Sequence, residues 1–425
     1  MNEKLLSFIW QFQYFEKSNL MTDDGLTVQV LKTGTMNTDS GPDFSGARII
    51  LNNLEWAGDI EIHVNASDWT KHDHQTNHSF ESVILQVVWN NDQKIIRKDG
   101  TELPTISLNG LVQKKTILRY QDLIGSSQII PCESQFAEIG DIEKYSMLDR
   151  VLMERMQTKS ENVLALWMVN KSDWEETAYQ LLGQHFGFKL NDVCFLRLCQ
   201  NIPRKVLLQQ HGDLFKIEAL LFGGSGLLPE NPSDEYTTRL AEEYRYLAQK
   251  YQLKEPLNGS EWKFLRLRPA GFPTLRLAQL AQFLADNDKV FNTLTNTNSI
   301  TELHKIFNLR QSEYWTTHLQ FGKTSGKSTP KMGTESSNNL IINVTIPLLF
   351  AYAKSLNRLE YQDKALQFLS EIPAENNRIT RIWKNLGMKV ETSADSQGLI
   401  QWYNDYCIPK RCLQCSIGAK LIRSN

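Results

Sequence analysis

The sequence predicts a mixed α+β protein, in which an N-terminal helix and a mixed β-sheet module precede a mostly α-helical C-terminal region. Apolar residues recur at helical spacing in 4–17, and short alternating segments separated by turn residues fill 27–108. Most of the remaining chain repeats its apolar residues with a period of about 3.6 residues. We therefore expect an α/β module at 1–135 and a helical region with a C-terminal cysteine cluster at 136–425.

The individual elements of the module follow from the same patterns. The opening helix is expected at 4–17 and a second helix near 68–78, with turn residues such as Gly34 and Asp99-Gly100 between the strands. The expected strands are 27–31, 47–51, 59–64, 83–89, 95–97 and 105–108. The expected helices of the second region are 142–168, 172–186, 191–200, 213–222, 234–252, 274–287, 300–308, 346–356, 361–371, 375–386 and 393–406. The polar segment 322–339 is expected to be a flexible loop.

Composition narrows the function classes. The chain has 46 Lys and Arg residues against 48 Asp and Glu residues, so it lacks the basic field of a protein that coats nucleic acid. This balance leaves room for an enzyme that acts on nucleic acid through a metal. The N-terminus does not resemble a signal peptide, and no apolar run reaches the length of about 18 residues that a membrane span needs. We expect a cytoplasmic protein with no membrane contact.

Acidic and histidine side chains concentrate in residues 41–78, which hold four of the eight histidines. On a strand with alternating side chains, Asp59, Glu61 and His63 share one face. A hairpin over 43–64 would bring Asp43 beside Glu61. Two neighbouring carboxylates repel unless a proton or a cation lies between them. We therefore expect a site for Mg²⁺ or Mn²⁺ on Asp43, Glu61 and His63.

Two further histidines, His72 and His74, are candidate ligands at the rim of this site. The alternative is that Asp-x-Glu-x-His is merely the solvent face of a sheet, with His72 and His74 on an exposed loop. Gly41-Pro42 and Gly58 mark tight backbone positions beside the carboxylates and favour the metal site.

These residues resemble the PD-(D/E)XK nuclease superfamily. Its core is a helix, a β-meander that carries Pro-Asp and then an acidic-x-Lys strand, a second helix and a further strand. Pro42-Asp43 would supply the first motif and Glu61-Ile62-His63 the second, with Glu3 or Glu16 as the helix carboxylate. The resemblance implies that Asp43, Glu61 and His63 are catalytic residues of a metal-dependent nuclease. The sequence departs from the family in having His63 where a lysine is usual.

A second resemblance extends over nearly the full length. The stretches GPDFSGARI, WAGDIEIHVNASDWTKHDH, SVILQVVW, FLRLRPAGFPTLRLAQLA and YCIPKRCLQCSIGAKLI look like an uncharacterised Bacteroidota family of unknown function. It implies a cytoplasmic protein and carries no activity. Members of that family tend to have Leu-His-Val-Val where this chain has Leu85-Gln86-Val87-Val88.

Three cysteines lie close together near the C-terminus, at Cys407, Cys412 and Cys415. Neighbouring Lys410 and Arg411 are expected to favour their thiolates. A structural zinc ion needs four ligands, so Cys132 or a histidine would complete the set. An iron–sulfur cluster is the less favoured cofactor for the same residues. The alternative is three plain thiols in a helical tail.

Arg266, Arg268 and Arg276 flank a Pro- and Gly-containing turn that leads into a helix. Guanidinium groups and helix N-termini both favour phosphate, so these arginines are the candidate phosphate-binding residues. The alternative is that they pair with carboxylates such as Glu242 and Glu243 between helices.

Three functions remain open. The first is a metal-dependent phosphodiesterase or nuclease-like enzyme acting on nucleic acid. The second is a catalytically inactive scaffold whose helical region binds a protein or RNA partner. The third is a zinc-dependent hydrolase of another substrate that uses Glu61 with the histidines.

Overall fold

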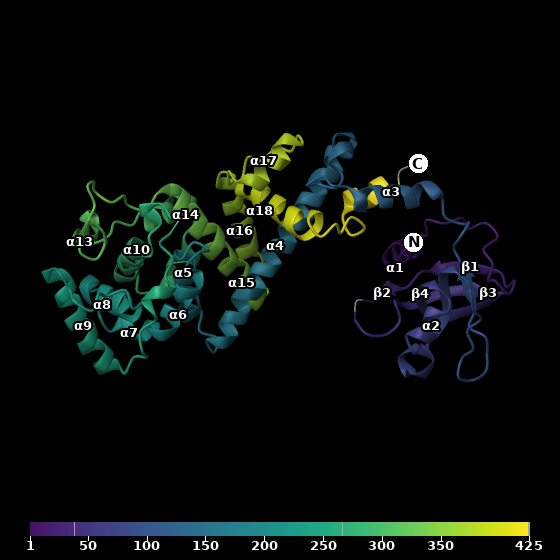
Figure 1. Cartoon of the computed structure of the whole chain (residues 1–425), viewed down its shortest axis with the longest axis horizontal. Coiled ribbons are helices and arrows are strands. Elements are labelled where there is room, and N and C mark those ends of the chain that lie inside the picture. Colours follow the sequence, from purple (N-terminus) through teal and green to yellow (C-terminus); the bar gives the residue numbers. More distant parts are fainter. Residues whose placement is uncertain (38, 266, 424–425) are drawn as a thin grey trace. The chain divides into compact units, whose positions relative to one another are not determined.

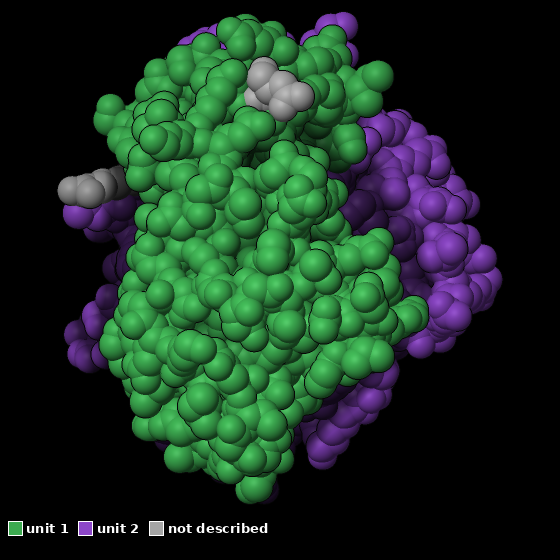
Figure 2. All heavy atoms as spheres, turned by 90° about the vertical axis from the view of Figure 1, so that its right-hand side faces the viewer, with its two compact units in different colours: residues 1–147, 402–425 green, residues 148–401 purple. Residues whose placement is uncertain are grey.

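A computed structural model describes residues 1–37, 39–265 and 267–423 and confirms the α+β class. The chain forms two compact units, residues 1–147 with 402–425 and residues 148–401 (Figure 2). The C-terminal segment, which the sequence-based division placed with the helical region, thus belongs to the sheet-containing unit. The reason is apolar burial, because Cys412 and Ile422 lie in the same core as Leu123 and the sheet.

The first unit contains a mixed sheet in the order β1-β3-β4-β5-β6, with β2 paired to β3. β1, β3 and β4 form an antiparallel meander, whereas β5 runs parallel to β4 and β6 parallel to β5. The chain therefore runs through a helix, a meander, a helical crossover and a parallel strand. The elements are α1 (Glu3–Gln11), β1 (Val28–Lys32), β2 (Thr35–Met36), β3 (Phe44–Leu51), β4 (Leu54–Asn65), α2 (Asp68–Lys71), β5 (Val83–Asn90), β6 (Thr105–Ser107), α3 (Lys114–Gly125) and α19 (Ser416–Arg423).

The sheet has one apolar face and one polar face at its centre. Ile60 and Ile62 of β4 join Leu85 and Val87 of β5 in the core that α1 covers (Figure 1). Because side chains alternate along a strand, Glu61, His63 and Gln86 lie on the opposite face. All three are nevertheless buried.

Two expected elements of this unit are shorter than the sequence pattern indicates. α1 ends at Gln11 rather than residue 17, since Gln13 adopts a positive φ of 55°. The second helix covers only α2 and is followed by two 3₁₀ turns, His74–Thr76 and His78–Phe80. The expected strand 95–97 is wrong, because this segment forms only an isolated bridge between Ile96 and Glu102.

The second unit is a helical assembly around one large apolar core. Its expected helices are present with shifts of a few residues at their ends. It contains most of α4 (Asp141–Val169), then α5 (Trp174–Phe186), α6 (Asp192–Asn201), α7 (Arg204–Leu208), α8 (Leu214–Gly224), α9 (Glu235–Tyr251), α10 (Pro273–Asp286), α11 (Val290–Asn296), α12 (Ile300–Ile306), α13 (Glu313–Thr317), β7 (His318–Gln320), β8 (Lys323–Thr324), α14 (Thr334–Leu340), α15 (Ile346–Leu356), α16 (Leu359–Glu371), α17 (Arg378–Asn385) and α18 (Ser393–Gln401).

The segment 322–339, expected to be a loop throughout, is partly ordered by burial. The residues of β8, within this segment, pair with β7. The helix α14 begins at Thr334 and buries Ser337. α14 continues through a π-helical turn, Ile341–Thr345, into α15. The resulting stretch Thr334–Leu356 is long and apolar enough to cross a membrane, but 67% of its most apolar window is buried inside the protein, as in a core helix.

Candidate metal centre

Asp43 and Glu61 are brought together where β3 begins beside β4. The backbone N–H of Asp43 donates to Glu61 Oε2 at 3.1 Å, and the backbone N–H of Ile62 donates to Asp43 Oδ2 at 3.0 Å. The register of the two strands shifts between Phe44 and Ala47, which pairs Phe44 with Ile60. This irregularity places both carboxyl groups on the polar face of the sheet.

Three histidines converge on the same point. The candidate ligand atoms of His63, His72 and His74 all lie within 4.8 Å of one another, although the three side chains range from buried to exposed. Glu61 Oε1 lies 3.5 Å from His63 Nε2 and 3.3 Å from His74 Nε2. We call Asp43, Glu61, His63, His72 and His74 the histidine–carboxylate cluster.

The short helical crossover after β4 returns His72 and His74 to the sheet. Asn65 is the last residue of β4 and Asp68 is the first residue of α2. The backbone N–H of Asn65 donates to Asp68 Oδ2 and so ties the start of the helix to the end of the strand. After α2, Asp73 adopts a left-handed conformation with φ of 57° and redirects the chain. His74 then stacks on Phe80, with 3.8 Å between ring centroids.

Burial strongly disfavours charge on this cluster. Burial, and to a smaller extent the neighbouring Asp43 carboxylate, raises the pKa of Glu61 to about 9. Burial also raises the pKa of Asp43 to about 6. Burial, and to a smaller extent His74, lowers the pKa of His63 to about 3. Burial, and to a smaller extent His72, lowers the pKa of His74 to about 4. The Nε2 atoms of His63 and His74 are buried and make no hydrogen bond within the described part of the chain. Neutral imidazoles with free nitrogens are what a metal ion requires.

Gln86 contacts the cluster from β5. Its side-chain nitrogen lies 3.0 Å from His63 Nδ1 and donates to the carbonyl oxygen of Ala66 at 3.2 Å. A metal-bound histidine usually has a hydrogen-bond partner on its second ring nitrogen, which orients the ring. Gln86 lies at that position with its amide nitrogen as a donor, which puts the proton of a neutral His63 on Nε2. An ion bound through Nε2 would require the proton on Nδ1 and the Gln86 amide turned so that Oε1 accepts it. The resemblance to sequences with histidine here was the signal that marked it.

Several nearby polar residues do not join the cluster. Asp59 lies on β4 but accepts hydrogen bonds from Gly46 N and Ser82 Oγ, because the β4–β5 register shifts between Asp59 and Ile60. His78 is exposed and pairs with Glu81. Of the two candidate helix carboxylates, Glu3 acts electrostatically on both Asp43 and Glu61, whereas Glu16 is bound to Ser18.

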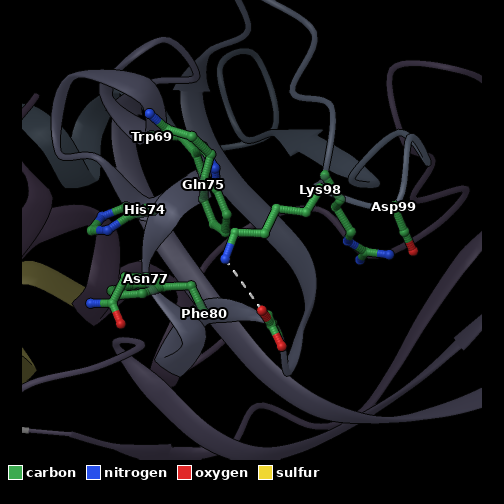
Figure 3. A pocket seen from close by; sticks show the side chains of 9 residues that line it. Trp69, His74, Gln75, Asn77, Phe80, Lys98 and Asp99 are labelled. Carbon is green, nitrogen blue, oxygen red and sulfur yellow. Dashed lines mark hydrogen bonds and ion pairs between the residues drawn. The ribbon is translucent and has the colours of Figure 1, made fainter.

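A pocket of about 320 Å³ adjoins the cluster and shares His74 with it. Trp69 and Phe80 supply apolar surface, and Arg97 and Lys98 supply positive charge. Figure 3 shows the Lys98 side chain reaching across this pocket. Its Nζ lies 3.5 Å from Glu81 Oε1. Sequence reasoning missed these residues, because they come from separate short segments with no shared motif.

Two of the three candidate phosphate-binding arginines lie in the described part of the chain, and they differ in burial. Arg266 lies outside the described residues. Arg268 is exposed, whereas Arg276 is buried and donates to Gln279 and Ser336, each at 2.9 Å. The Arg276 guanidinium also lies 4.2 Å from the centre of the Phe188 ring. Arg276 therefore packs between helices of the second unit, with uncharged partners in place of the expected Glu242 or Glu243.

The four candidate metal-binding cysteines lie in the first unit. Cys407, Cys412 and Cys415 are buried, and Cys132 is half-buried. Burial raises the pKa values of the Cys132, Cys407 and Cys412 thiols and so opposes the thiolates that Lys410 and Arg411 were expected to favour. Lys410 does lower the pKa of Cys412, but burial has the larger effect.

The chain belongs to the family described as "Protein of unknown function (DUF2851)", whose model matches residues 3–378. The match includes the whole histidine–carboxylate cluster and Cys132, and it ends before Cys407. No curated protein and no solved structure matches the chain.

Proposed function

We propose that this family member is a metal-dependent phosphodiesterase that acts on nucleic acid, with the histidine–carboxylate cluster as its metal site. The observation that carries the proposal is the convergence of three imidazole ligand atoms within 4.8 Å, with Glu61 3.3 Å from one of them. We also keep the cytoplasmic location and the Bacteroidota origin, both expected from the sequence, as proposals.

The order of elements in the first unit supports this assignment. A helix, an antiparallel meander, a helical crossover and a strand parallel to β4 follow one another, as in the core of PD-(D/E)XK nucleases. Asp43 lies just before β3 and Glu61 lies on β4, where that core has its two acidic motifs. His63 replaces the usual lysine, so we assign it to metal binding.

The donor set favours Mn²⁺ or Zn²⁺ over Mg²⁺, because imidazole nitrogens suit transition metals better than they suit magnesium. A bound ion of this kind would lower the pKa of a coordinated water and stabilise charge on a phosphoryl oxygen. The ion would be held by His63, His72, His74 and Glu61. Asp43 would position Glu61 through its backbone N–H and add a second carboxylate beside the ion. In the adjoining pocket, Lys98 would contact a substrate phosphate.

The three imidazoles also favour a second candidate, a zinc-dependent hydrolase of another substrate. Three histidines with an open position are a common arrangement at catalytic zinc. The two candidates share the metal site and differ only in the group that enters the pocket.

The test combines metal analysis with cleavage assays. We would purify the full chain, measure bound metals, and incubate it with labelled DNA and RNA strands in the presence of Mn²⁺, Zn²⁺ or Mg²⁺. Asp43→Asn and Glu61→Gln should abolish cleavage. Asp59→Asn is the matched control, because Asp59 lies on the same strand but bonds to Gly46 and Ser82.

Cleavage that survives Glu61→Gln would overturn the proposal. Bound zinc without cleavage of nucleic acid, combined with Glu61-dependent hydrolysis of a carboxylic ester or amide, would select the second candidate.

A further inference from the structure

Four cysteines from distant parts of the sequence meet in the first unit. Cys132 follows α3, whereas Cys407, Cys412 and Cys415 precede α19, which packs on α3. Lys410, between these cysteines, donates from Nζ to the carbonyl oxygens of Ile124 and Ser126 at 2.7 and 2.8 Å. The thiols are close enough for Cys412 and Cys415 to act on Cys132 electrostatically, and for all three to act on Cys407. We call these four residues the cysteine cluster.

The local backbone is shaped around the cysteine cluster. Cys407 ends a π-helical segment, Trp402–Cys407, and π-helical turns are rare and concentrate at functional sites. The first turn of α19 lies against the loop that carries Cys412, since a Cβ atom on Gly418 would lie 2.3 Å from the Cys412 carbonyl oxygen. The C-terminal cysteines are thus buried side chains of a compact loop.

The spacing of the thiols excludes a cage preformed around one small ion. Zinc–sulfur bonds of about 2.3 Å in a tetrahedron put sulfur atoms about 3.8 Å apart. Within the described part of the chain, the histidines alone form a group of three or more ligand atoms that all lie within 4.8 Å of one another. The four thiols act on one another electrostatically, but no three of the described ones lie at the mutual distances of ligands to a single zinc ion.

We propose that Cys132, Cys407, Cys412 and Cys415 bind an iron–sulfur cluster. The sequence Cys407-x4-Cys412-x2-Cys415 has the spacing of the three adjacent ligands in plant-type iron–sulfur sites, where a distant cysteine is the fourth ligand. Here Cys132 is that distant ligand. This inference replaces zinc as the favoured cofactor, and it does not depend on the proposed phosphodiesterase activity.

The cluster would have a structural role. It would link the chain end to the segment after α3 by four covalent metal–sulfur bonds, so that 402–425 stays with the first unit. The environment fits this group, because a thiolate-bound cluster is negatively charged and the ammonium group of Lys410 is held beside Cys412. No redox step is needed for this role.

The test measures iron, acid-labile sulfide and zinc in the full-length protein, isolated without oxygen from iron-supplied cells. We expect iron and sulfide in equal amounts and a broad visible absorption band that gives the protein a brown colour. Cys132→Ser and Cys412→Ser should each lose the sulfide and the band. Cys194→Ser is the matched control, because Cys194 is a buried cysteine of the second unit.

Two results would overturn the inference: zinc without sulfide, or a folded wild-type protein with neither metal at the cysteines. The combined His63→Ala and His74→Ala variant separates the two sites, since it should lose any ion of the histidine–carboxylate cluster and keep its sulfide. Since the wild-type measurement requires no variant to fold, instability of Cys132→Ser cannot rescue the inference.

Discussion

The two units each bury a carboxyl group, but they treat it differently. In the second unit, Glu218 is only 1% exposed, and its two oxygens accept hydrogen bonds from Tyr236 at 2.9 Å and Ser312 at 2.7 Å. In the first unit, Glu61 is also buried, but its neighbours are His63 and His74, whose Nε2 atoms make no hydrogen bond to any described residue.

This contrast separates a structural polar cluster from a candidate site. The hydrogen bonds of Glu218 offset the cost of its burial, because each oxygen has a neutral donor. The histidine–carboxylate cluster leaves lone pairs uncompensated at one point, which is costly unless a further group binds there. Burial of a titratable residue by itself therefore does not identify a site. Convergence of unsatisfied ligand atoms does.

The largest expected effect comes from removing a ligand histidine. His63→Ala or His74→Ala should weaken binding of Mn²⁺ or Zn²⁺ at least about 100-fold. A residue bonded to the ion contributes more than a residue that only hydrogen-bonds to such a ligand, whose loss costs about 10- to 100-fold. Titration calorimetry with the metal ion measures this. His78→Ala is the control, since His78 is exposed and pairs with Glu81. Equal losses in all three variants would contradict the site.

The second prediction concerns pH and the structural carboxyl group. Burial raises the pKa of Glu218 from 4.5 to about 7, so the folded state retains its proton in a range where the unfolded state has lost it. The stabilisation by this group is fully present below pH 4.5 and is lost as pH rises through 7. Relative to Glu218→Gln, wild type should lose about 3 kcal/mol of unfolding free energy between pH 4.5 and 8. Urea unfolding at several pH values measures this, and parallel pH curves would contradict it.

The third prediction sharpens the role of Gln86 in the first unit. An ion on Nε2 of His63 requires the ring proton on Nδ1, and Gln86 can accept that proton through Oε1 once its amide has turned. Gln86→Leu removes this acceptor and should weaken metal binding about 10-fold. Gln86→Glu should restore or exceed wild-type affinity, because a carboxylate accepts the ring N–H of a metal-bound histidine. An affinity unchanged by Gln86→Leu would show that His63 needs no such partner.

The smallest expected effect lies in the pocket. Lys98→Ala should reduce the salt dependence of nucleic-acid binding by about one unit in the log–log slope, as expected for one lost phosphate contact. Lys94→Ala is the control, because Lys94 is exposed and pairs with Glu102 at 3.0 Å. Fluorescence anisotropy with a labelled strand at several salt concentrations measures both. Identical slopes for both variants would place the nucleic acid elsewhere.

Local patterns were sufficient for most of the fold. Alternating residues predicted β4 and β5, and the 3.6-residue period predicted most long helices, because both patterns report which side of an element is buried. Short elements failed where tertiary contacts decide the conformation. Residues 95–97 have strand-like side chains but lie outside the sheet ladder, and α14 was missed in a polar segment because Ser337 and Leu340 are buried only after folding.

The same division applies to the candidate site. The shared polar face of Asp43, Glu61 and His63 could be predicted from the sequence, because strand alternation and a hairpin are local properties. His72, His74 and Cys132 could be named only as candidate ligands. Their approach to His63 and to the C-terminal cysteines, and that of Gln86 to His63, depends on the folded chain. These contacts join residues from separate elements, and they depend on how the crossover and α19 pack against the rest of the unit. The physical reason is that burial and ligand convergence are properties of the packed chain, whereas the periodicity of a single segment reports only its own orientation.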